Sequence, residues 1–309
     1  MTDLPAAVIT SYRPGADLLR IVEAIAPQVH AVVIVDDGSG AAAHDVLEAA
    51  EARGARVIRL GQNSGIAAAL NHGIRAAFDL GVDAVVTFDQ DSFPPEGFVA
   101  ALSRARDQRR AAGRRSSPLV PEVFAGVRQA ARFDRGGELP ARGAIQSGML
   151  VPRDVIDDVG MMREDLFIDL VDTEFELRCR AAGRPVMAVP GLSLGHALGA
   201  RYIRRGPAIP GIPRVLTLSA PFRYYYRARN RVLIDRAYVR RFPLRIIRDS
   251  VIDRVYFRVV RSTAEPAAGM KEILREGRRA GRRGDGGRMP ERLQAAAERV
   301  TWAAERVGD

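Results

Sequence analysis

The stretch AVVIVDDGS, residues 31–39, decides the fold that this sequence predicts. It is an apolar run that ends in two adjacent carboxylates and a glycine, and DAVVTFDQD (83–91) repeats the same plan further along the chain. A short, continuous apolar run is typical of a strand that is buried on both faces. Both stretches therefore predict buried strands whose last residues are acidic.

Helical patterns separate the apolar runs. Apolar residues recur at helical spacing in 16–28, and the alanine-containing runs 44–54 and 64–81 each end at a glycine. Strand patterns return at 6–10 and 55–60. Repeated strand–helix–strand units predict an α/β fold with a mostly parallel sheet and helices on both faces.

The strand ends carry the first candidate site, because ligands of such sheets bind beyond the carboxyl ends of the strands. Asp36 and Asp37 in VDDGS can accept hydrogen bonds from a nucleobase or a ribose, or they can simply organise a strand-to-helix turn. Asp89 and Asp91 in FDQDS point the same way from a strand end and would repel each other unless a cation bridges them. Oxygen ligands suit Mg²⁺ or Mn²⁺, and a solvated acidic turn is the alternative.

Two further candidates follow. FIDLVDTEF (167–175) places Asp169, Asp172 and Glu174 just before a predicted helix. They could present a base to a substrate, or they could serve as favourable charge and caps at a helix start. His196 follows the last predicted strand and is either a ligand or a structural histidine.

Cysteine content and hydropathy bear on the compartment. Cys179 is the only cysteine, so no disulfide can form within the chain, and its helical context predicts a small buried side chain. No apolar stretch approaches the roughly 18–20 residues that span a bilayer. The first residues lack the pattern of a signal peptide. We expect a cytoplasmic protein that can contact the inner face of the cell membrane peripherally.

The charge is unevenly distributed. The net charge is +10, but residues 1–200 carry 21 basic and 26 acidic side chains, whereas 201–309 carry 26 and 11. Such a basic C-terminal third indicates a polyanionic partner, for which an anionic membrane surface, a pyrophosphate-linked lipid and nucleic acid are candidates.

The basic third predicts mainly helical structure. Residues 221–261 interleave aromatic, aliphatic and arginine residues, which is typical of one or two amphipathic helices. The run 201–214 is a Gly/Pro-rich basic connector, the Gly/Arg-rich run 277–290 is expected to be mobile, and 291–307 predicts a short helix. Two interpretations of 221–261 stay open: contact with a membrane, or a helical appendage with its arginines in water.

The order of the motifs resembles a known family. The runs TSYR, VDDGS, NSGIAAALNHG, FDQDS, QSGML, FIDLVDTEFELR and GHALG are similar to those of the family 2 glycosyltransferases with the GT-A fold. The resemblance covers roughly residues 5–235. The DQDS form of the metal motif, FIDLVDTE and YYYRARN (224–230) resemble the bacterial rhamnosyltransferase branch, which typically uses dTDP-L-rhamnose.

The resemblance implies a domain organisation. A Rossmann-like GT-A catalytic domain would cover 1–205, with a nucleotide-binding half over about 1–100 and an acceptor half over about 101–205. A basic, mainly helical extension would cover 206–309.

The resemblance also implies roles on the donor side. Thr10, Tyr12 and Asp37 would contact the pyrimidine base. Asp89 would contact the ribose or join the metal shell. The nucleotide pocket would also be shaped by Asp36, Asn63 and Gly65.

On the reactive side, the resemblance implies a Mg²⁺ or Mn²⁺ ion held by Asp91 and His196, and Asp172 as the catalytic base. The acceptor or sugar side would include Ser147, Gly148, Asp169 and Glu174. Two positions depart from the family pattern: Arg13 stands where asparagine is common, and Leu70 stands where many members carry an arginine. The second departure weakens any phosphate contact at that position.

The expected activity is therefore metal-dependent, inverting transfer of a sugar from a dTDP-sugar, with L-rhamnose favoured, to a hydroxyl of a cell-surface glycan or a lipid-linked acceptor. The alternative within the same fold is a galactofuranosyl- or other hexosyltransferase that uses a UDP-sugar. A nucleic-acid-binding protein ranks lower, because it leaves the acidic strand ends unexplained, so no nucleic acid is expected as a partner.

Overall fold

The computed structural model divides the chain into two compact units. The first comprises Met1–Glu164 and Val171–Ala197, and the second comprises Asp165–Leu170 and Leu198–Asp309. The short segment Asp165–Leu170 therefore belongs to the second unit, although the chain on both sides of it belongs to the first. The described residues are 4–134, 136–196, 201–203 and 214–307, so most of the predicted connector 201–214 lies outside them.

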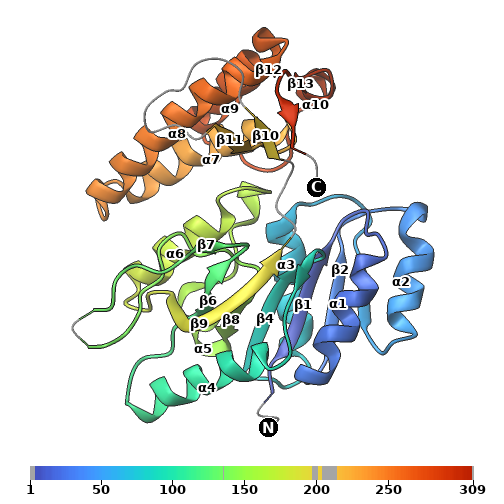
Figure 1. Cartoon of the computed structure of the whole chain (residues 1–309), viewed down its shortest axis with the longest axis vertical. Helices are drawn as coiled ribbons and strands as arrows, with labels where there is room; N and C mark the ends of the chain where they lie inside the picture. Colours follow the sequence, from blue (N-terminus) through green and yellow to red (C-terminus); the bar gives the residue numbers. More distant parts are fainter. Residues whose placement is uncertain (1–3, 135, 197–200, 204–213, 308–309) are drawn as a thin grey trace. The chain divides into compact units, whose positions relative to one another are not determined.

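The first unit is built on one sheet, whose described strands run in the order β3-β2-β1-β4-β8-β6-β9-β5, with β7 paired to β6 (Figure 1). Strands β3, β2, β1 and β4 pair in parallel, as do β6 and β9, whereas β8 runs antiparallel between β4 and β6. The predicted α/β fold with a mostly parallel sheet is confirmed. The strands are β1 (Ala6–Ser11), β2 (Val32–Asp36), β3 (Arg56–Arg59), β4 (Ala84–Asp89), β5 (Ser92–Phe93), β6 (Leu119–Phe124), β7 (Val127–Arg128), β8 (Met149–Pro152) and β9 (Met187–His196).

Helices cover both faces of this sheet because the side chains of each strand alternate between the faces. Ala7 and Ile9 of β1 join one apolar core with α1, α2 and α4. Val8, between them, faces α3, and a Cβ on Gly73 of α3 would lie 2.3 Å from its Cγ1. The missing side chain at residue 73 thus lets α3 approach the sheet closely. The helices are α1 (Asp17–Ile25), α2 (His44–Glu51), α3 (Ile66–Phe78), α4 (Phe98–Ala111), α5 (Arg153–Val159) and α6 (Val171–Ala181).

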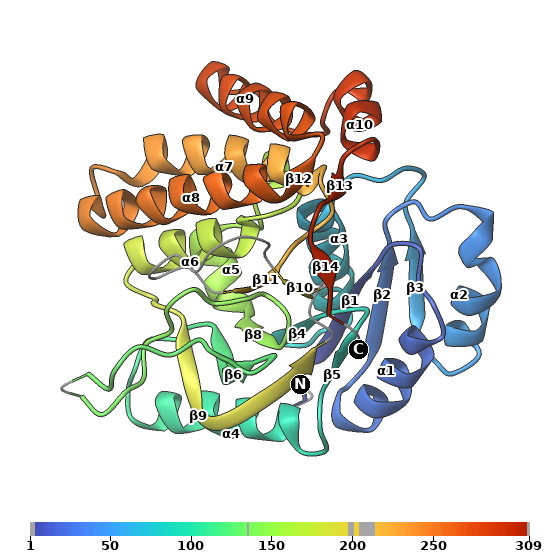
Figure 2. The same cartoon turned by 45° about the horizontal axis from the view of Figure 1, so that its top comes forward.

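The second unit is mainly helical. Figure 2 shows α7, α8 and α9 side by side, with α10 next to α9. A Cβ on Gly277 would lie 2.4 Å from the backbone oxygen of Tyr225, and one on Gly281 would lie 2.6 Å from that of Arg229, so the two glycines allow α9 to pack directly on α7. The elements are β10 (Arg201–Ile203), β11 (Val215–Thr217), α7 (Arg223–Tyr238), α8 (Pro243–Thr263), β12 (Ala264–Glu265), α9 (Ala267–Arg283), α10 (Glu291–Glu298), β13 (Thr301–Trp302) and β14 (Glu305–Arg306).

Two expectations for this unit were wrong. The run 277–290, expected to be mobile, begins inside α9, which continues to Arg283, because its glycines are packing positions rather than breaks. The predicted helix 291–307 ends at Glu298, and the chain then forms strands β13 and β14, which pair with β12 and β10. Pairing with distant strands overrides the weak local helix preference there. The described residues contain no helix that is both long and apolar enough to cross a membrane.

Candidate functional site

The acidic strand ends meet at one edge of the sheet in the first unit. Strand β1 lies between β2 and β4, and the parallel register places Ser11 beside Asp36 and Thr10 beside Asp89. Because β2 and β4 lie on opposite sides of β1, the chain leaves the ends of these strands in different directions. Open α/β sheets bind ligands in the crevice that forms at such a point.

Asp89, Asp91 and His196 form a group that could hold a metal ion. One ligand atom from each lies within 4.8 Å of the others, and all three side chains are half-buried. Asp89 ends β4, Asp91 lies in the following turn, and His196 ends β9, where the β5–β9 pairing sets it opposite Ser92. Two carboxylates and an imidazole form a donor set that fits a divalent cation such as Mn²⁺ or Mg²⁺.

The surroundings of His196 favour its ligating form. Its Nδ1 lies 2.9 Å from the Ser92 hydroxyl and 3.5 Å from Asp91 Oδ1, and its ring packs on Phe124 with 4.9 Å between centroids. Burial lowers the pKa of His196 below its ordinary value, although the negative charge of Asp91 opposes the shift. The neutral imidazole, which is the form that binds metals, is therefore favoured near neutral pH.

A buried network supports this group from behind. Ser147 is fully buried, and its Oγ accepts a hydrogen bond from the backbone N–H of Asp89 at 3.0 Å and lies 2.6 Å from Ser92 Oγ. The Gln146 side-chain amide donates to Asp89 Oδ1. Ser147 thus orients the backbone and neighbours of the carboxylates, and its predicted place on the sugar or acceptor side stays a prediction.

Gly148 is constrained by packing. Its φ is +79°, and a Cβ would lie 2.6 Å from Leu194 Cδ2 and 3.1 Å from the Phe98 ring. Its backbone N–H donates to the Thr87 carbonyl at 2.7 Å. Only glycine fits such a left-handed, close-packed position without strain, so this residue shapes the start of β8 beside the network.

The two carboxylates of VDDGS organise backbone. Asp37 accepts hydrogen bonds from the backbone N–H groups of Ser64 at 2.6 Å and Gly65 at 2.9 Å, at the start of α3. Asp36 accepts from the backbone N–H of Ser39 at 3.0 Å and from its hydroxyl. A carboxylate at a helix N-terminus is stabilising, so the turn role that the sequence left open is present for both residues. Contact of Asp37 with a base stays a prediction.

Tyr12 presents an aromatic ring at the same edge. Its side chain is 40% exposed, and the Arg13 guanidinium lies over its ring at 5.1 Å. Its backbone is tied to the FDQDS turn, because Gln90 Oε1 accepts from Tyr12 N–H at 2.8 Å and Gln90 Nε2 donates to its carbonyl at 3.2 Å. Thr10 is almost buried within β1. A ring that is exposed while its backbone is fixed is suited to stacking on a planar base.

Asn63 holds an unpaired polar atom. Its Oδ1 is buried, and no hydrogen-bond partner for it occurs among the residues that the structure describes. The backbone there packs tightly on the VDDGS turn, since a Cβ on Gly38 would lie 2.6 Å from Asn63 N. A cavity of about 380 Å³ is lined by Asp36 and Gly38 of this turn and by Gly61. A buried acceptor without a donor is costly, so a ligand N–H or O–H is a fitting partner.

Comparison with known proteins identifies the family. Residues 6–163, about half of the chain, match the model for glycosyl transferase family 2. The chain belongs to this family. It is also 35% identical over 243 residues to the dTDP-rhamnosyl transferase RfbF of Shigella flexneri, over 74% of this chain and 79% of that protein. The sequence-based assignment to family 2 glycosyltransferases is confirmed.

Solved structures show the same fold. The family 2 chain superposes on S. aureus TarS 1–349 in complex with UDP-GlcNAc with a TM-score of 0.51 and 14% identity, over 74% of this chain and 65% of that one. For GalNAc-T7 with UDP, GalNAc and Mn²⁺, the TM-score is 0.49 and the identity 15%, over 62% and 44%. The chain thus spans less than two thirds of each of these structures. The likeness to TarS supports the predicted GT-A fold.

Carboxylates near the start of α6 form the other candidate part of this family 2 site. Glu174 is buried and pairs with Arg178 at 3.0 Å, one helical turn later. Asp172 is half-buried in the first turn, where Oδ1 accepts from the backbone N–H of Thr173 at 2.7 Å. Glu176 is buried and accepts from two backbone N–H groups of the 143–144 turn. Asp172 is therefore the most accessible of the three.

The segment just before α6 has an unusual backbone. Phe167, Asp169 and Leu170 all have φ values of 62–64°, which L-residues with side chains rarely adopt. Asp169 is held by a two-pronged ion pair with Arg223, with both distances 3.0 Å. Strain of this kind persists only where surrounding structure compensates for it, and it clusters at functional sites.

Two buried residues of α7 compensate for this strain. Arg229 and Asn230 are fully buried. Arg229 Nη2 donates to the carbonyls of residues 165 and 166, and Asn230 Nδ2 donates to those of residues 166, 168 and 169, at 2.7–3.0 Å. Arg229 and Asn230 therefore hold the backbone of residues 165–169, which lies just before Asp172 in the chain.

Sequence reasoning missed several of these supporting residues. Ser92, Gln146 and Gln90 each lie beside a residue that was singled out, and Arg229 and Asn230 lie in the YYYRARN motif. Adjacency to a motif was the only local signal for them, because their partners lie far away in the chain.

Proposed function

We propose that this glycosyltransferase transfers L-rhamnose from dTDP-L-rhamnose to a hydroxyl group, with inversion at the anomeric carbon. The observation that carries the proposal is the Asp89–Asp91–His196 group at the β1–β4 edge of a family 2 chain. The choice of donor is supported by the 35% identity to the protein named dTDP-rhamnosyl transferase RfbF.

Asp172 serves as the base in this proposal. Its carboxylate takes the proton of the acceptor hydroxyl while that oxygen forms a bond to the anomeric carbon. The bond between that carbon and the phosphate oxygen breaks, and its electron pair leaves with dTDP. One displacement of this kind inverts the configuration. Half-burial at the start of α6 suits the role, because it leaves the Asp172 carboxylate within reach of an acceptor hydroxyl.

Asp91 and His196 would hold the metal ion, with Asp89 completing the set or binding the ribose. A bound Mg²⁺ or Mn²⁺ supplies positive charge to the departing diphosphate. Ser92, Ser147 and Gln146 keep the ligands in place through the contacts described above.

The donor nucleotide would lie along the neighbouring strand ends. Tyr12 offers its exposed ring to the base, and Asn63 offers its unpaired oxygen. Thr10, Asp37 and Gly65 shape the backbone around them. The acceptor is proposed to be a glycan or lipid-linked hydroxyl, used at the cytoplasmic face of the membrane.

Isothermal titration tests the donor and the metal together. We expect dTDP-L-rhamnose to bind in the presence of Mn²⁺ and to bind more tightly than UDP-galactofuranose or UDP-GlcNAc. Asp91→Asn should weaken the metal-dependent part of the affinity, whereas Asp45→Asn, which removes an exposed carboxylate on α2, should not. Preference for a UDP-sugar would favour the alternative donor class.

The assignment of the base is tested by turnover. Asp172→Asn should lower transfer by roughly 10²–10⁴-fold, as expected for the loss of a general base, and should leave dTDP affinity nearly unchanged. Full activity in this variant would remove Asp172 from the mechanism without affecting the choice of donor.

A further inference from the structure

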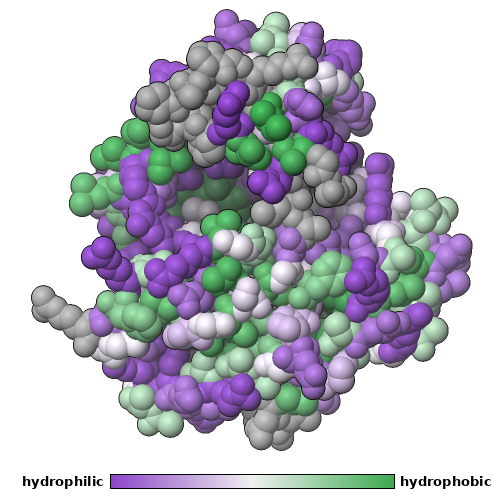
Figure 3. Space-filling view, in the orientation of Figure 1, coloured by the Kyte–Doolittle hydropathy of each residue, from purple (hydrophilic) through white to green (hydrophobic). Residues whose placement is uncertain are grey.

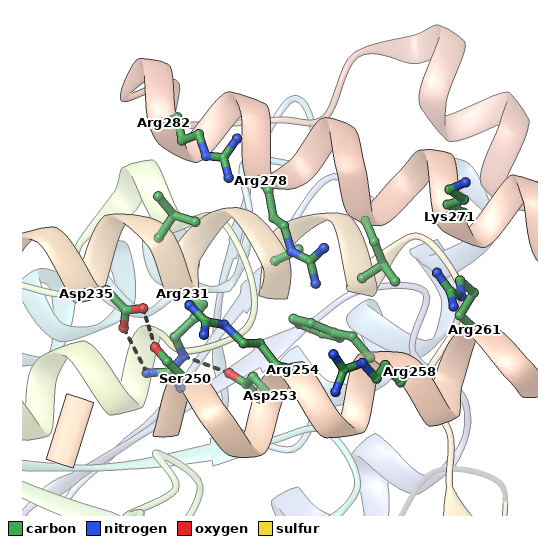
Figure 4. A pocket seen from close by; sticks show the side chains of 14 residues that line it. Arg231, Asp235, Ser250, Asp253, Arg254, Arg258, Arg261, Lys271, Arg278 and Arg282 are labelled. Atoms are coloured by element: carbon green, nitrogen blue, oxygen red, sulfur yellow. Dashed lines mark hydrogen bonds and ion pairs between the residues drawn. The ribbon is translucent and has the colours of Figure 1, made fainter. Parts of the chain in front are cut away.

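A groove in the second unit collects positive charge. It has a volume of about 430 Å³ and lies between α8 and α9, with α7 at one end. Figure 4 shows basic side chains from α8 and from α9 converging on it. These cations are Arg254, Arg258, Arg261, Lys271, Arg278 and Arg282.

The acidic side chains of the groove do not neutralise these cations. Asp253 is engaged by Arg227 at 2.8 Å and by Arg231 at 2.7 Å, and Asp235 accepts a hydrogen bond from Ser250. Within the part of the chain that the structure describes, no ion pair involves any of the six cations. The six cations therefore concentrate positive charge in the groove, while its two carboxylates are paired with Arg227 and Arg231.

Arg278 shows the effect of this crowding. It is half-buried and lies over the Phe257 ring at 5.5 Å. Burial, together with the positive charges of Arg254, Arg282 and Arg261, lowers the pKa of its guanidinium below the ordinary value. An anion in the groove would relieve this repulsion, because it would place opposite charge among like charges.

The outer face of α8 carries a different feature beside the groove. Leu244, Ile247, Val251 and Val255 follow one another at helical spacings of three and four residues, so they form one stripe. They are between 40% and 84% exposed. Figure 3 shows hydrophobic surface at the end of the second unit where α7 leads into α8. We call these four residues the apolar stripe.

The stripe and the groove share one helix. Arg254 and Arg258 continue α8 from the stripe into the groove, so apolar and cationic groups lie next to each other. A helix that pairs an exposed apolar face with flanking arginines is suited to the boundary between lipid headgroups and acyl chains. A nucleic acid would match the charge but would leave the aliphatic stripe in water, since base stacking requires aromatic side chains.

We propose that α8 docks on an anionic phospholipid bilayer, with the apolar stripe entering the interface and the arginine groove receiving lipid phosphate groups. This surface gives a structural basis to the membrane location proposed above. It does not depend on the identity of the sugar donor.

Vesicle co-sedimentation with the full chain tests the proposal. We expect binding to vesicles of phosphatidylcholine with phosphatidylglycerol, weak binding to phosphatidylcholine alone, and weaker binding at high salt. Arg254→Gln with Arg258→Gln should weaken binding about 25-fold, since each cation near an anionic surface contributes about fivefold. Leu244→Asn with Ile247→Asn should weaken it about tenfold or more, because apolar insertion is lost.

Matched controls separate docking from charge and from folding. Arg104→Gln removes an exposed arginine on α4 of the first unit and should bind vesicles like the parent chain. All the substituted residues of α8 are exposed, so unchanged melting curves are expected for both double variants. The dTDP-L-rhamnose affinity should also stay unchanged, so failure of vesicle binding and failure of the proposed donor are told apart.

Four results would overturn the proposal. The first is equal binding to neutral and anionic vesicles, and the second is vesicle binding that survives both double variants. The third is release of the chain from vesicles by millimolar inorganic pyrophosphate with no effect of the stripe variant, which would mean a site for soluble phosphate. The fourth is self-association through the apolar stripe, measured by light scattering, or binding of duplex DNA, measured by gel shift, in place of vesicle binding.

Discussion

Asn230 provides the sharpest test of what holds the backbone of residues 165–170 in place. Its amide donates to the carbonyls of Leu166, Ile168 and Asp169, in a segment where three residues with side chains take left-handed backbone angles. Replacing it with alanine removes these donors without adding bulk. The consequence for catalysis assumes that Asp172, two residues after this segment, is the base.

The cost of Asn230→Ala follows from the bonds that are lost. The Leu166 carbonyl keeps a donor, because Arg229 Nη2 also reaches it at 2.8 Å. The carbonyls of the half-buried Ile168 and Asp169 lose the amide, and the buried Arg229 Nε loses its acceptor, Asn230 Oδ1, at 2.9 Å. An unsatisfied buried group costs about 1–3 kcal/mol, and a half-buried one costs less because water can reach it. We therefore expect the free energy of unfolding to fall by about 2–4 kcal/mol. Each left-handed residue stores about 1–3 kcal/mol of strain, so the segment should relax once it is released.

Urea denaturation and steady-state turnover measure the two effects. Relaxation of the segment should shift the start of α6, and a displacement of about 1 Å at a reacting group can cost about 100-fold in rate. We expect kcat to fall about 10- to 100-fold with little change in dTDP affinity, because the residues proposed to bind the nucleotide lie on other elements. The matched control is Ile246→Ala, a buried α8 residue outside the apolar cluster that contains Phe167.

The control decides the interpretation, because truncating a buried isoleucine also costs about 2–5 kcal/mol. If Ile246→Ala lowers kcat as much as Asn230→Ala at equal stability loss, the effect is general destabilisation and the positioning role is refuted. An Asn230→Ala variant with parental stability and kcat would refute the whole chain of reasoning.

Three further outcomes follow from local geometry. Gly148→Ala should lower the free energy of unfolding by about 2–5 kcal/mol in urea titrations. The control Gly81→Ala, at a similar φ of +82° but with open space around it, should cost about 1 kcal/mol. Equal costs would contradict the clash at residue 148. Burial raises the pKa of the Cys179 thiol to about 12, so iodoacetamide at pH 8 should label it only after unfolding, and mass spectrometry of the native chain should find no adduct. Asp37→Asn should lower stability by about 1–2 kcal/mol, because two N–H groups at the start of α3 lose a charged acceptor; an unchanged melting temperature would argue against that role.

Local patterns were enough to predict most of the first unit. Apolar runs such as 31–35 and 84–88 became buried strands, and the helical runs between them became helices. Strand period and parallel pairing then place Asp36 and Asp89 at the same edge, so the carboxylates could be predicted to meet. The burial of the Cys179 side chain was also predicted, because a lone cysteine in a helical run usually behaves as a small buried hydrophobe.

Local patterns failed where long-range contacts decide. The strands β13 and β14 form only because β12 and β10 are available to pair, so 291–307 could not be recognised as more than a helix. The glycines at 277 and 281 look like breaks in sequence, yet they are the points where α9 touches α7. In both cases the energy comes from neighbours that the local sequence does not contain.

For the acidic strand ends, the sequence predicted one part of the site and the tertiary structure decided another. Residue type and spacing predicted a cation site at Asp89 and Asp91, because that prediction depends on ligand chemistry and on the period of a strand. The resemblance to family 2 added His196 to the predicted metal ligands. Only the folded chain shows which carboxylate accepts bonds from backbone N–H groups and which is supported by Ser147. It also shows what holds residues 165–170, the segment before Asp172. Hydrogen bonds act over about 3 Å and are indifferent to sequence separation, so partners far apart along the chain become visible only when it is folded.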